Sequence, residues 1–271
     1  GFRWRIAPVS ALTGLSLLAG LKGGRQRRWI AGLVSVALSI LSRDTFLARE
    51  LPGERPLARG ESQNVIVQIP PRRRARRRVV FVAHLDSGVH RVTTSSQIVS
   101  HLPRTLGAVT LLALVGGVLT ALAGGNQRWR ALRTGIAGLA LGGAGLAVID
   151  ESGPSVAGAN GNASGVAALL AVARALRHNP LENTEVVLAF TGSATAVGAG
   201  ADTLAVEYGE SWSDALWVVV SNVGAGELCW VTRHGISPYA YYHPHPEAMR
   251  VIERVADVRP DLGLMGKPML S

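Results

Sequence analysis

The stretch VVFVAHLDSG, residues 79–88, and the later stretch GANGNASGVAALLAVARAL, residues 158–176, decide the fold. The first is a β-branched apolar run that ends in polar residues, which is typical of a buried strand. The second passes from a Gly/Asn-rich turn into apolar residues at helical spacing. Residues 89–157 separate the two and include the most apolar part of the chain. We therefore predict a strand and a helix of one domain with a segment inserted between them.

Strands and helices alternate outside the apolar blocks, and this order predicts an α/β fold with a mixed, mostly parallel sheet flanked by helices. Functional residues of such sheets gather at the carboxyl ends of the strands, where His84, Gly192 and Ser221 fall. The segment Asn162-Ala163-Ser164 resembles a helix cap. The predicted strands are residues 79–83, 185–190, 216–220 and 228–232, and the predicted helices are residues 164–177, 196–208 and 246–258.

The composition is sufficient for one core of ordinary size and leaves apolar sequence over. The chain has 271 residues, of which 48% are hydrophobic and 17% are charged. The single cysteine, Cys229, rules out an intramolecular disulfide, and we expect it to be a buried structural thiol. The net charge of +10 suits anionic lipid or nucleic acid. Because no set of stacking aromatic residues and no nucleic-acid motif accompanies it, no nucleic-acid partner is expected.

Four apolar blocks form two predicted helical hairpins. Residues 105–125 contain no charged side chain, and as a helix they reach about 31 Å, enough to cross a bilayer core. In the next block, Gly138 and Gly142 have the spacing that lets two helices approach closely. Buried core helices of a soluble protein are the alternative, and Arg3 with Arg5 imitates a secretory signal without a cleavage site. The other three blocks are residues 134–149, 6–21 and 29–42.

The basic connectors of the two hairpins predict the orientation. KGGRQRR at 22–28 and NQRWRALR at 126–133 contain no acidic residue, so both should face the cytoplasm and the α/β part should be extracytoplasmic. The run RRRARRR at 72–78 would then lie outside. Because β-rich sequence flanks this run, we expect it at the tip of a β-hairpin, solvated or touching lipid headgroups. Trp4, Trp29 and Trp129 lie at block edges, where the headgroup zone favours them.

These patterns divide the chain into four segments. Residues 1–42 are a predicted membrane hairpin, and residues 43–104 are the first part of the α/β domain. Residues 105–150 are a predicted inserted transmembrane hairpin, and residues 151–271 are the second part of the α/β domain. The chain starts without a methionine and stops in mid-pattern, so we expect a fragment of a longer protein, truncated at its C-terminus.

Four blocks, VFVAHLDS, GANGNASGVAALL, VVLAFTGSATAVGAGA and VVVSNVG, occur in the order of the signature blocks of the co-catalytic zinc aminopeptidases (clan MH, peptidase family M28). The sequence resembles this family over residues 61–90 and 156–235. The resemblance implies a zinc-peptidase-like α/β fold, a zinc cofactor and the removal of N-terminal residues from peptides. His84 matches a zinc ligand of the family, and Asp86 matches the residue that orients the site.

The remaining family positions carry residues that cannot do the implied work. Glycine and alanine have no side-chain donor, and a neutral hydroxyl is a poor zinc ligand beside histidine or carboxylate. A general base for the bound water is also missing. We therefore expect His84 and Asp86 to be vestigial and hydrogen-bonded to each other, without bound zinc. Gly161 replaces the bridging Asp, Ala194 the general-base Glu, Thr195 the second Glu of that pair, and Ser221 the second Asp ligand.

The sequence leaves different functions open. One is a membrane-anchored, catalytically impaired relative of the peptidases that serves as a binding or scaffold module, with the membrane and possible peptides as partners. Another is an active zinc-dependent exopeptidase with substitute ligands, although prolines hold the chain extended around the last two candidates. Transport is disfavoured because no apolar block carries an internal ionisable residue. The substitute candidates are His90, Asp150, Glu151, His243 and His245.

Overall fold

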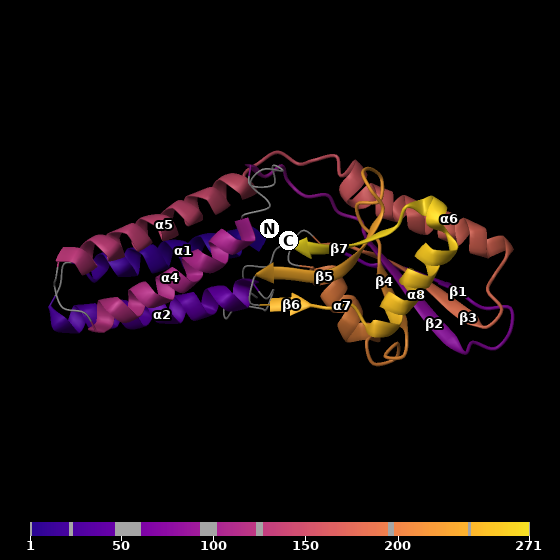
Figure 1. Cartoon of the computed structure of the whole chain (residues 1–271), viewed down its shortest axis with the longest axis horizontal. Helices are drawn as coiled ribbons and strands as arrows, with labels where there is room; N and C mark the ends of the chain where they lie inside the picture. The colour runs from indigo at the N-terminus through magenta and orange to yellow at the C-terminus, as the bar shows by residue number, and fades with distance from the viewer. Residues whose placement is uncertain are drawn as a thin grey trace.

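The computed structural model describes residues 2–21, 24–46, 61–92, 102–122, 127–194, 198–237 and 240–270. Four helices occupy one end of the molecule, and the strands with their covering helices occupy the other (Figure 1). The chain leaves the α/β part after β2, passes through two helices of the bundle, and returns before α6. Helices α4 and α5 thus lie between β2 and α6 in the chain.

The four long helices pack into one bundle. They are α1 (Phe2–Ala19), α2 (Arg25–Phe46), α4 (Leu102–Leu122) and α5 (Gln127–Glu151). Helix α1 contacts both α2 and α5, and α2 contacts α4. The helix pairs α1–α2 and α4–α5 thus pack against each other in one bundle.

Glycines allow the closest helix contacts, but they are not the glycines that the sequence suggests. A Cβ at Gly32 of α2 would lie 2.6 Å from the carbonyl oxygen of Gly117 of α4, so only glycine permits this approach. At Gly138 and Gly142 an added Cβ meets no atom within 4 Å. The prediction that these two glycines bring helices together is wrong, because their faces of α5 have no close neighbour among the described residues.

The bundle buries many small and polar side chains and leaves many large apolar side chains outside, although Leu17 and Ile136 lie inside. Ala137, Ala140, Ala144 and Ala147 form a buried stripe on α5, and Thr120 is fully buried. A water-soluble bundle has the opposite arrangement, with its largest apolar residues in the core. The outward-facing apolar residues that are at least half exposed are Leu12, Leu15, Ile30, Leu33, Ile40, Leu111, Leu122, Leu139 and Ile149.

A four-stranded sheet forms the centre of the α/β part. Its order is β1-β3-β2-β4, with β1 (Val65–Ile69) antiparallel to β3 (Thr184–Thr191). Strand β2 (Arg77–His84) is parallel to β3 and to β4 (Leu216–Val219). The predicted mixed, mostly parallel sheet flanked by helices is confirmed.

Helices cover both faces of this sheet because successive residues of β3 point to opposite sides. Helix α6 (Ser164–His178) covers one face and α7 (Ala199–Tyr208) lies against the other. Each face of the sheet carries a cluster of buried apolar side chains. The packing of these two clusters holds the strands, and therefore the strand ends that lead into the loops, in place. The α6 side contains Ala83, Leu169, Val186, Leu188 and Phe190, and the α7 side contains Val80, Val82, Val187, Ala189, Leu204 and Trp212.

The arginine run at 72–78 does not form the predicted β-hairpin. Strand β3 lies between β1 and β2, so the two strands flanking the run are not paired with each other. The backbone N–H groups of Arg72 and Arg73 instead donate to the carbonyls of Leu181 and Glu182. The run thus lies at the edge where β2 and β3 begin, and this edge points away from the helical bundle (Figure 1). These arginines therefore lie on the part of the molecule remote from the bundle.

A second, three-stranded sheet has the order β6-β5-β7. Its strands are β5 (Cys229–Ser237), β6 (Ala240–Tyr242) and β7 (Met265–Leu270), and α8 (Pro246–Val258) lies between β6 and β7 in the sequence. Cys229 is exposed, so the prediction of a buried thiol is wrong. The cysteine is the first residue of its strand, where the sheet ends.

A short bridge joins the bundle to the α/β part. Val89 pairs with Ser155 in an isolated antiparallel bridge. The backbone N–H of Val156 donates to Gly88 O at 3.0 Å, and that of His90 to Pro154 O at 2.7 Å. The chain segments entering and leaving the inserted helices are therefore held together directly beside the ends of β2 and α5.

Candidate functional site

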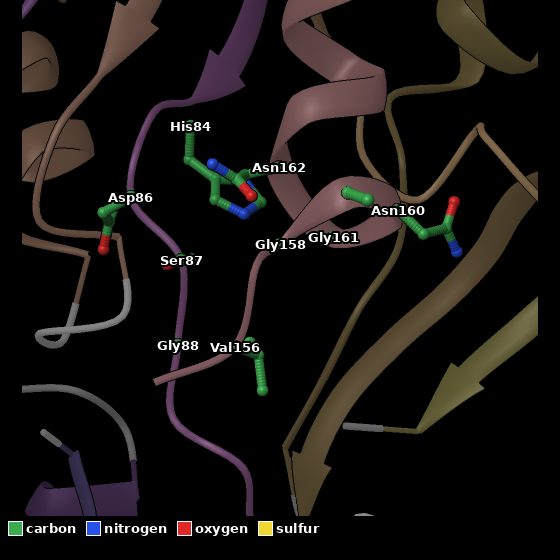
Figure 2. A pocket seen from close by; sticks show the side chains of 10 residues that line it. His84, Asp86, Ser87, Gly88, Val156, Gly158, Asn160, Gly161 and Asn162 are labelled. Carbon is green, nitrogen blue, oxygen red and sulfur yellow. The ribbon is translucent and has the colours of Figure 1, made fainter. Parts of the chain in front are cut away.

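A pocket of about 240 Å³ lies beyond the carboxyl end of β2. One wall is the segment after β2 and the other is the segment before α6 (Figure 2). The first wall contains the end of the stretch 79–88, and the second contains the start of the stretch 158–176. The pocket-lining residues are His84, Asp86, Ser87, Gly88, Val156, Gly158, Ala159, Asn160, Gly161 and Asn162.

His84 and Asp86 both line the pocket, but they do not form the expected pair. His84 is the last residue of β2 and stands beside Thr191 in the parallel register. The Asp86 carboxylate accepts a hydrogen bond from the backbone N–H of Ala194 at 2.8 Å, and Figure 2 shows Asp86 pointing away from His84. No hydrogen bond between His84 and Asp86 is found in the described part of the chain, so that expectation is wrong. Asp86 instead fixes the loop that follows β3.

The Gly/Asn-rich block forms a short π-helix, η3 (Ala159–Ala163), before α6. Gly158 begins it with φ 70°, and a Cβ there would lie 2.0 Å from Asn162 Oδ1. The Asn162 amide donates to Leu85 O at 2.7 Å. Its Oδ1 is buried and has no hydrogen-bond donor among the described residues. This asparagine therefore holds the two walls of the pocket together.

The predicted helix cap is wrong, because α6 has no side-chain cap and these polar residues bond to other segments. Ser164 Oγ donates to Asn160 O at 2.6 Å and accepts from Val223 N–H at 3.1 Å. Asn160 Oδ1 accepts from Gly224 N–H at 2.8 Å. The loop after β4 is thereby attached to η3 and to the first turn of α6. The only sequence signal for this role is the density of asparagine and serine in the block.

Two of the replaced family positions are joined to each other. The hydroxyl of Ser221 donates to the carbonyl oxygen of Gly161 at 3.0 Å, and it accepts from the Asn222 amide at 3.0 Å. A direct hydrogen bond thus occupies the region where the resemblance implies two carboxylates around metal ions. At Gly161 a Cβ would meet no atom within 4 Å, so the space that an acidic side chain needs is still open.

Backbone strain accompanies this site. Ser193 and Asn222 have φ values of 53° and 55°, and they are the non-glycine residues with positive φ in the described part of the chain. Such conformations are uncommon outside glycine and cluster at functional sites. Each of the two directly neighbours a replaced family position, Ala194 and Ser221 respectively. Strained backbone thus lies next to two of the replaced positions.

The described residues do not fit a zinc pair. A dinuclear site needs a bridging carboxylate and several anionic or imidazole donors, yet Gly161 and Ala194 offer no donor atom. Ser221 offers a hydroxyl that is already engaged, and Asp86 accepts from Ala194. No group of three or more His, Cys, Asp or Glu side chains with metal-binding geometry occurs in the described ranges. Thr195 lies outside the described residues.

The substitute ligands do not converge on the pocket. Glu151 accepts from Arg91 in a salt bridge of 2.9 Å, and Asp150 is fully buried in α5. His245 accepts from the backbone N–H of Glu247 and caps α8. None of these candidates, His90 and His243 included, lines the pocket of His84.

Comparison with known proteins identifies a family resemblance over part of the chain. The family model described as "Peptidase family M28" matches residues 143–221. The matched segment runs from the last turns of α5 to the end of β4 and includes Gly161, Ala194 and Ser221. It is less than a third of the chain and does not include His84 or Asp86. No curated protein and no solved structure shows significant similarity to the chain.

Proposed function

We propose, from the match of residues 143–221 to the model of peptidase family M28, that the α/β part of this chain is a peptidase-like domain of that family without zinc-dependent hydrolysis. Its function would be to bind polypeptide, in the pocket of His84, as a membrane-tethered module. The observation that carries the proposal is the hydrogen bond between Ser221 Oγ and Gly161 O at 3.0 Å. It joins two positions that would each need a carboxylate in a zinc peptidase.

Physical chemistry supports a stable metal-free site. Carboxylates gathered around a metal repel one another when the metal is absent, and neutral replacements remove that repulsion. The hydrogen bonds of Ser164, Asn160 and Ser221 hold the β4 loop without any ion. The same replacements remove the side chain that would take a proton from bound water. Stability is thus gained where the hydrolytic chemistry is lost.

The membrane-tethered part of the proposal is supported by the bundle. Among the described residues, α5 is the one helix that is both long enough and apolar enough to cross a membrane. Shorter apolar helical segments lie at Ala7–Ala19 and Ala113–Leu122. Many leucine and isoleucine side chains of the bundle face outward, and alanine and threonine make up much of its interior. Without a hydrophobic driving force between helices in lipid, small residues are the ones expected at their contacts. We propose that the bundle is embedded in the membrane, with the α/β part extracytoplasmic.

Metal analysis and an activity assay test the absence of catalysis. The full chain, purified in detergent without chelators, should contain far less than one zinc ion per chain. It should also show no release of nitroaniline from aminoacyl-nitroanilides, with or without added zinc. About two zinc ions per chain, as a two-metal site requires, together with hydrolysis that disappears in His84→Ala would overturn the proposal. Arg74→Gln, a change at an exposed residue far from the pocket, is the matched control.

Cysteine labelling tests the orientation. Cys229 is exposed on the α/β part, so a membrane-impermeant maleimide should label it from outside the cell. In a Cys229→Ser background, Gln127→Cys at the exposed start of α5 should react only after the membrane is opened. Labelling of both positions from the same side would contradict the proposed span.

A further inference from the structure

Arg133 is a buried cation at one end of the helical bundle. Its relative exposure is 1%. Its Nε donates to the carbonyl of Trp129, four residues earlier in α5, at 3.1 Å. The guanidinium therefore extends back toward the start of α5. Nη1 is also buried and finds no hydrogen-bond acceptor among the described residues. A buried charge that lacks a partner is costly, so this group needs an anion.

The surroundings of Arg133 are positive. Arg28 of α2 and Arg130 of α5 are close enough for their charges to act on it. Neither α2 nor α5 has an acidic residue in its first turn, and both helices begin at the end of the bundle remote from the α/β part (Figure 1). The positive ends of two helix dipoles thus add to the arginine charges. An anion drawn to this end would meet several donors at once.

An apolar groove lies at the same end of the bundle. It is open, measures about 720 Å³ and runs between α1 and α2, with Arg27 in its lining. Leu18 lines the groove and also packs against the cluster that contains Ile136, one turn of α5 beyond Arg133. The groove and the buried guanidinium therefore lie at the same end of the bundle. A ligand that used both would have an anionic head and an apolar tail.

We propose that this end of the bundle binds an anionic phospholipid. The phosphate oxygens accept from Arg133 and from its neighbours Arg28 and Arg130, and an acyl chain lies in the groove of Leu18 and Ile30. Arginine suits this role because its planar fork of donors matches phosphate oxygens. Trp29 and Trp129, each 39% exposed at the same end, suit the headgroup level. The proposal rests on the proposed membrane placement of the bundle.

Native mass spectrometry of the full chain in detergent tests the site. Phosphatidylglycerol should remain bound at activation energies that remove phosphatidylcholine, which shares the phosphate but is zwitterionic. Arg133→Gln should weaken phosphatidylglycerol binding by about tenfold, the effect of losing a charge-assisted hydrogen bond. Arg74→Gln removes the same charge from an exposed site on the α/β part and should leave binding unchanged. A second variant, Arg133→Lys, keeps the charge without the fork and should retain an intermediate affinity.

The outcomes separate the site from the membrane placement. Equal retention of the two lipids, or equal binding by the wild type and Arg133→Gln with both folded, overturns the lipid site but leaves the membrane proposal standing. If inorganic phosphate raises the melting temperature as much as phosphatidylglycerol does, the site takes a free anion and the lipid assignment is wrong. If the full chain stays monodisperse without detergent, the membrane placement fails first.

Discussion

Restoring two carboxylates should turn the metal-free site into one that responds to zinc. In the double variant Gly161→Asp, Ser221→Asp, the new side chain at position 161 enters open space, because a Cβ there has no neighbour within 4 Å. The change at Ser221 removes its hydrogen bond to Gly161 O, worth about 1 kcal/mol. Repulsion between the two neighbouring carboxylates costs about 1 kcal/mol more. Without metal the melting temperature should therefore fall by about 4–8 °C.

Zinc should reverse this loss because His84 lies in the same pocket and supplies a third donor. At a free zinc concentration of about 100 times the dissociation constant, binding to the folded state adds about 2.7 kcal/mol. This corresponds to a rise of about 5–10 °C, measured by scanning fluorimetry of the full chain in detergent. Adding His84→Ala to the double variant should abolish the rise. A wild-type protein that shows the same rise would refute the reasoning, because its donor set would then already be sufficient.

Two further comparisons use glycines as matched pairs. Gly158→Ala should lower the free energy of unfolding by about 2 kcal/mol, because φ is 70° and the new Cβ would meet Asn162 Oδ1. Gly161→Ala, in helical backbone and open space, should raise the free energy of unfolding by about 0.5 kcal/mol. Equal effects of the two substitutions in urea denaturation would contradict the pocket geometry. Gly32→Leu should lower bundle stability in detergent by about 2 kcal/mol through overpacking against Gly117, whereas Gly138→Leu should change it little, and the reverse order of melting temperatures would show that α5 uses its other face.

The strands and helices of the α/β part could be predicted from local sequence because their periodicity reflects burial. The sequence predicts a helix over residues 164–177, and the structure has α6 at Ser164–His178. It predicts a strand over residues 185–190, and the structure has β3 at Thr184–Thr191. The helix predicted at 246–258 coincides with α8. In each case one or both faces repeat apolar residues at the spacing of the element.

Features that depend on contacts between distant segments could not be predicted. The β-rich flanks of the arginine run suggest a hairpin, but nothing local reveals that β3 inserts between them. The spacing of Gly138 and Gly142 does not tell which side of α5 meets a neighbour. Exposure of Cys229 depends on where β5 begins.

The candidate site could be located from sequence but not described. The resemblance identifies His84, Asp86, Gly161, Ala194 and Ser221 as positions of one site. In the structure the first three line one pocket. Ala194 is hydrogen-bonded to Asp86, and Ser221 is hydrogen-bonded to Gly161. The resemblance does not identify the partners that now hold them. The link from Asp86 to the Ala194 backbone spans 108 residues of sequence, and such pairings follow from the assembled fold alone.

The bridge between Val89 and Ser155 limits what the pocket can reach. Gly158 lies only seven positions after the end of α5 at Glu151, and seven fully extended residue steps span about 25 Å. With the bundle in a bilayer, the pocket would lie close to the lipid surface. Chains emerging from the same bilayer would then encounter it at a far higher local concentration than peptides free in the surrounding fluid. For the proposed polypeptide-binding pocket, such a position favours the exposed ends of neighbouring membrane proteins over dissolved peptides as ligands.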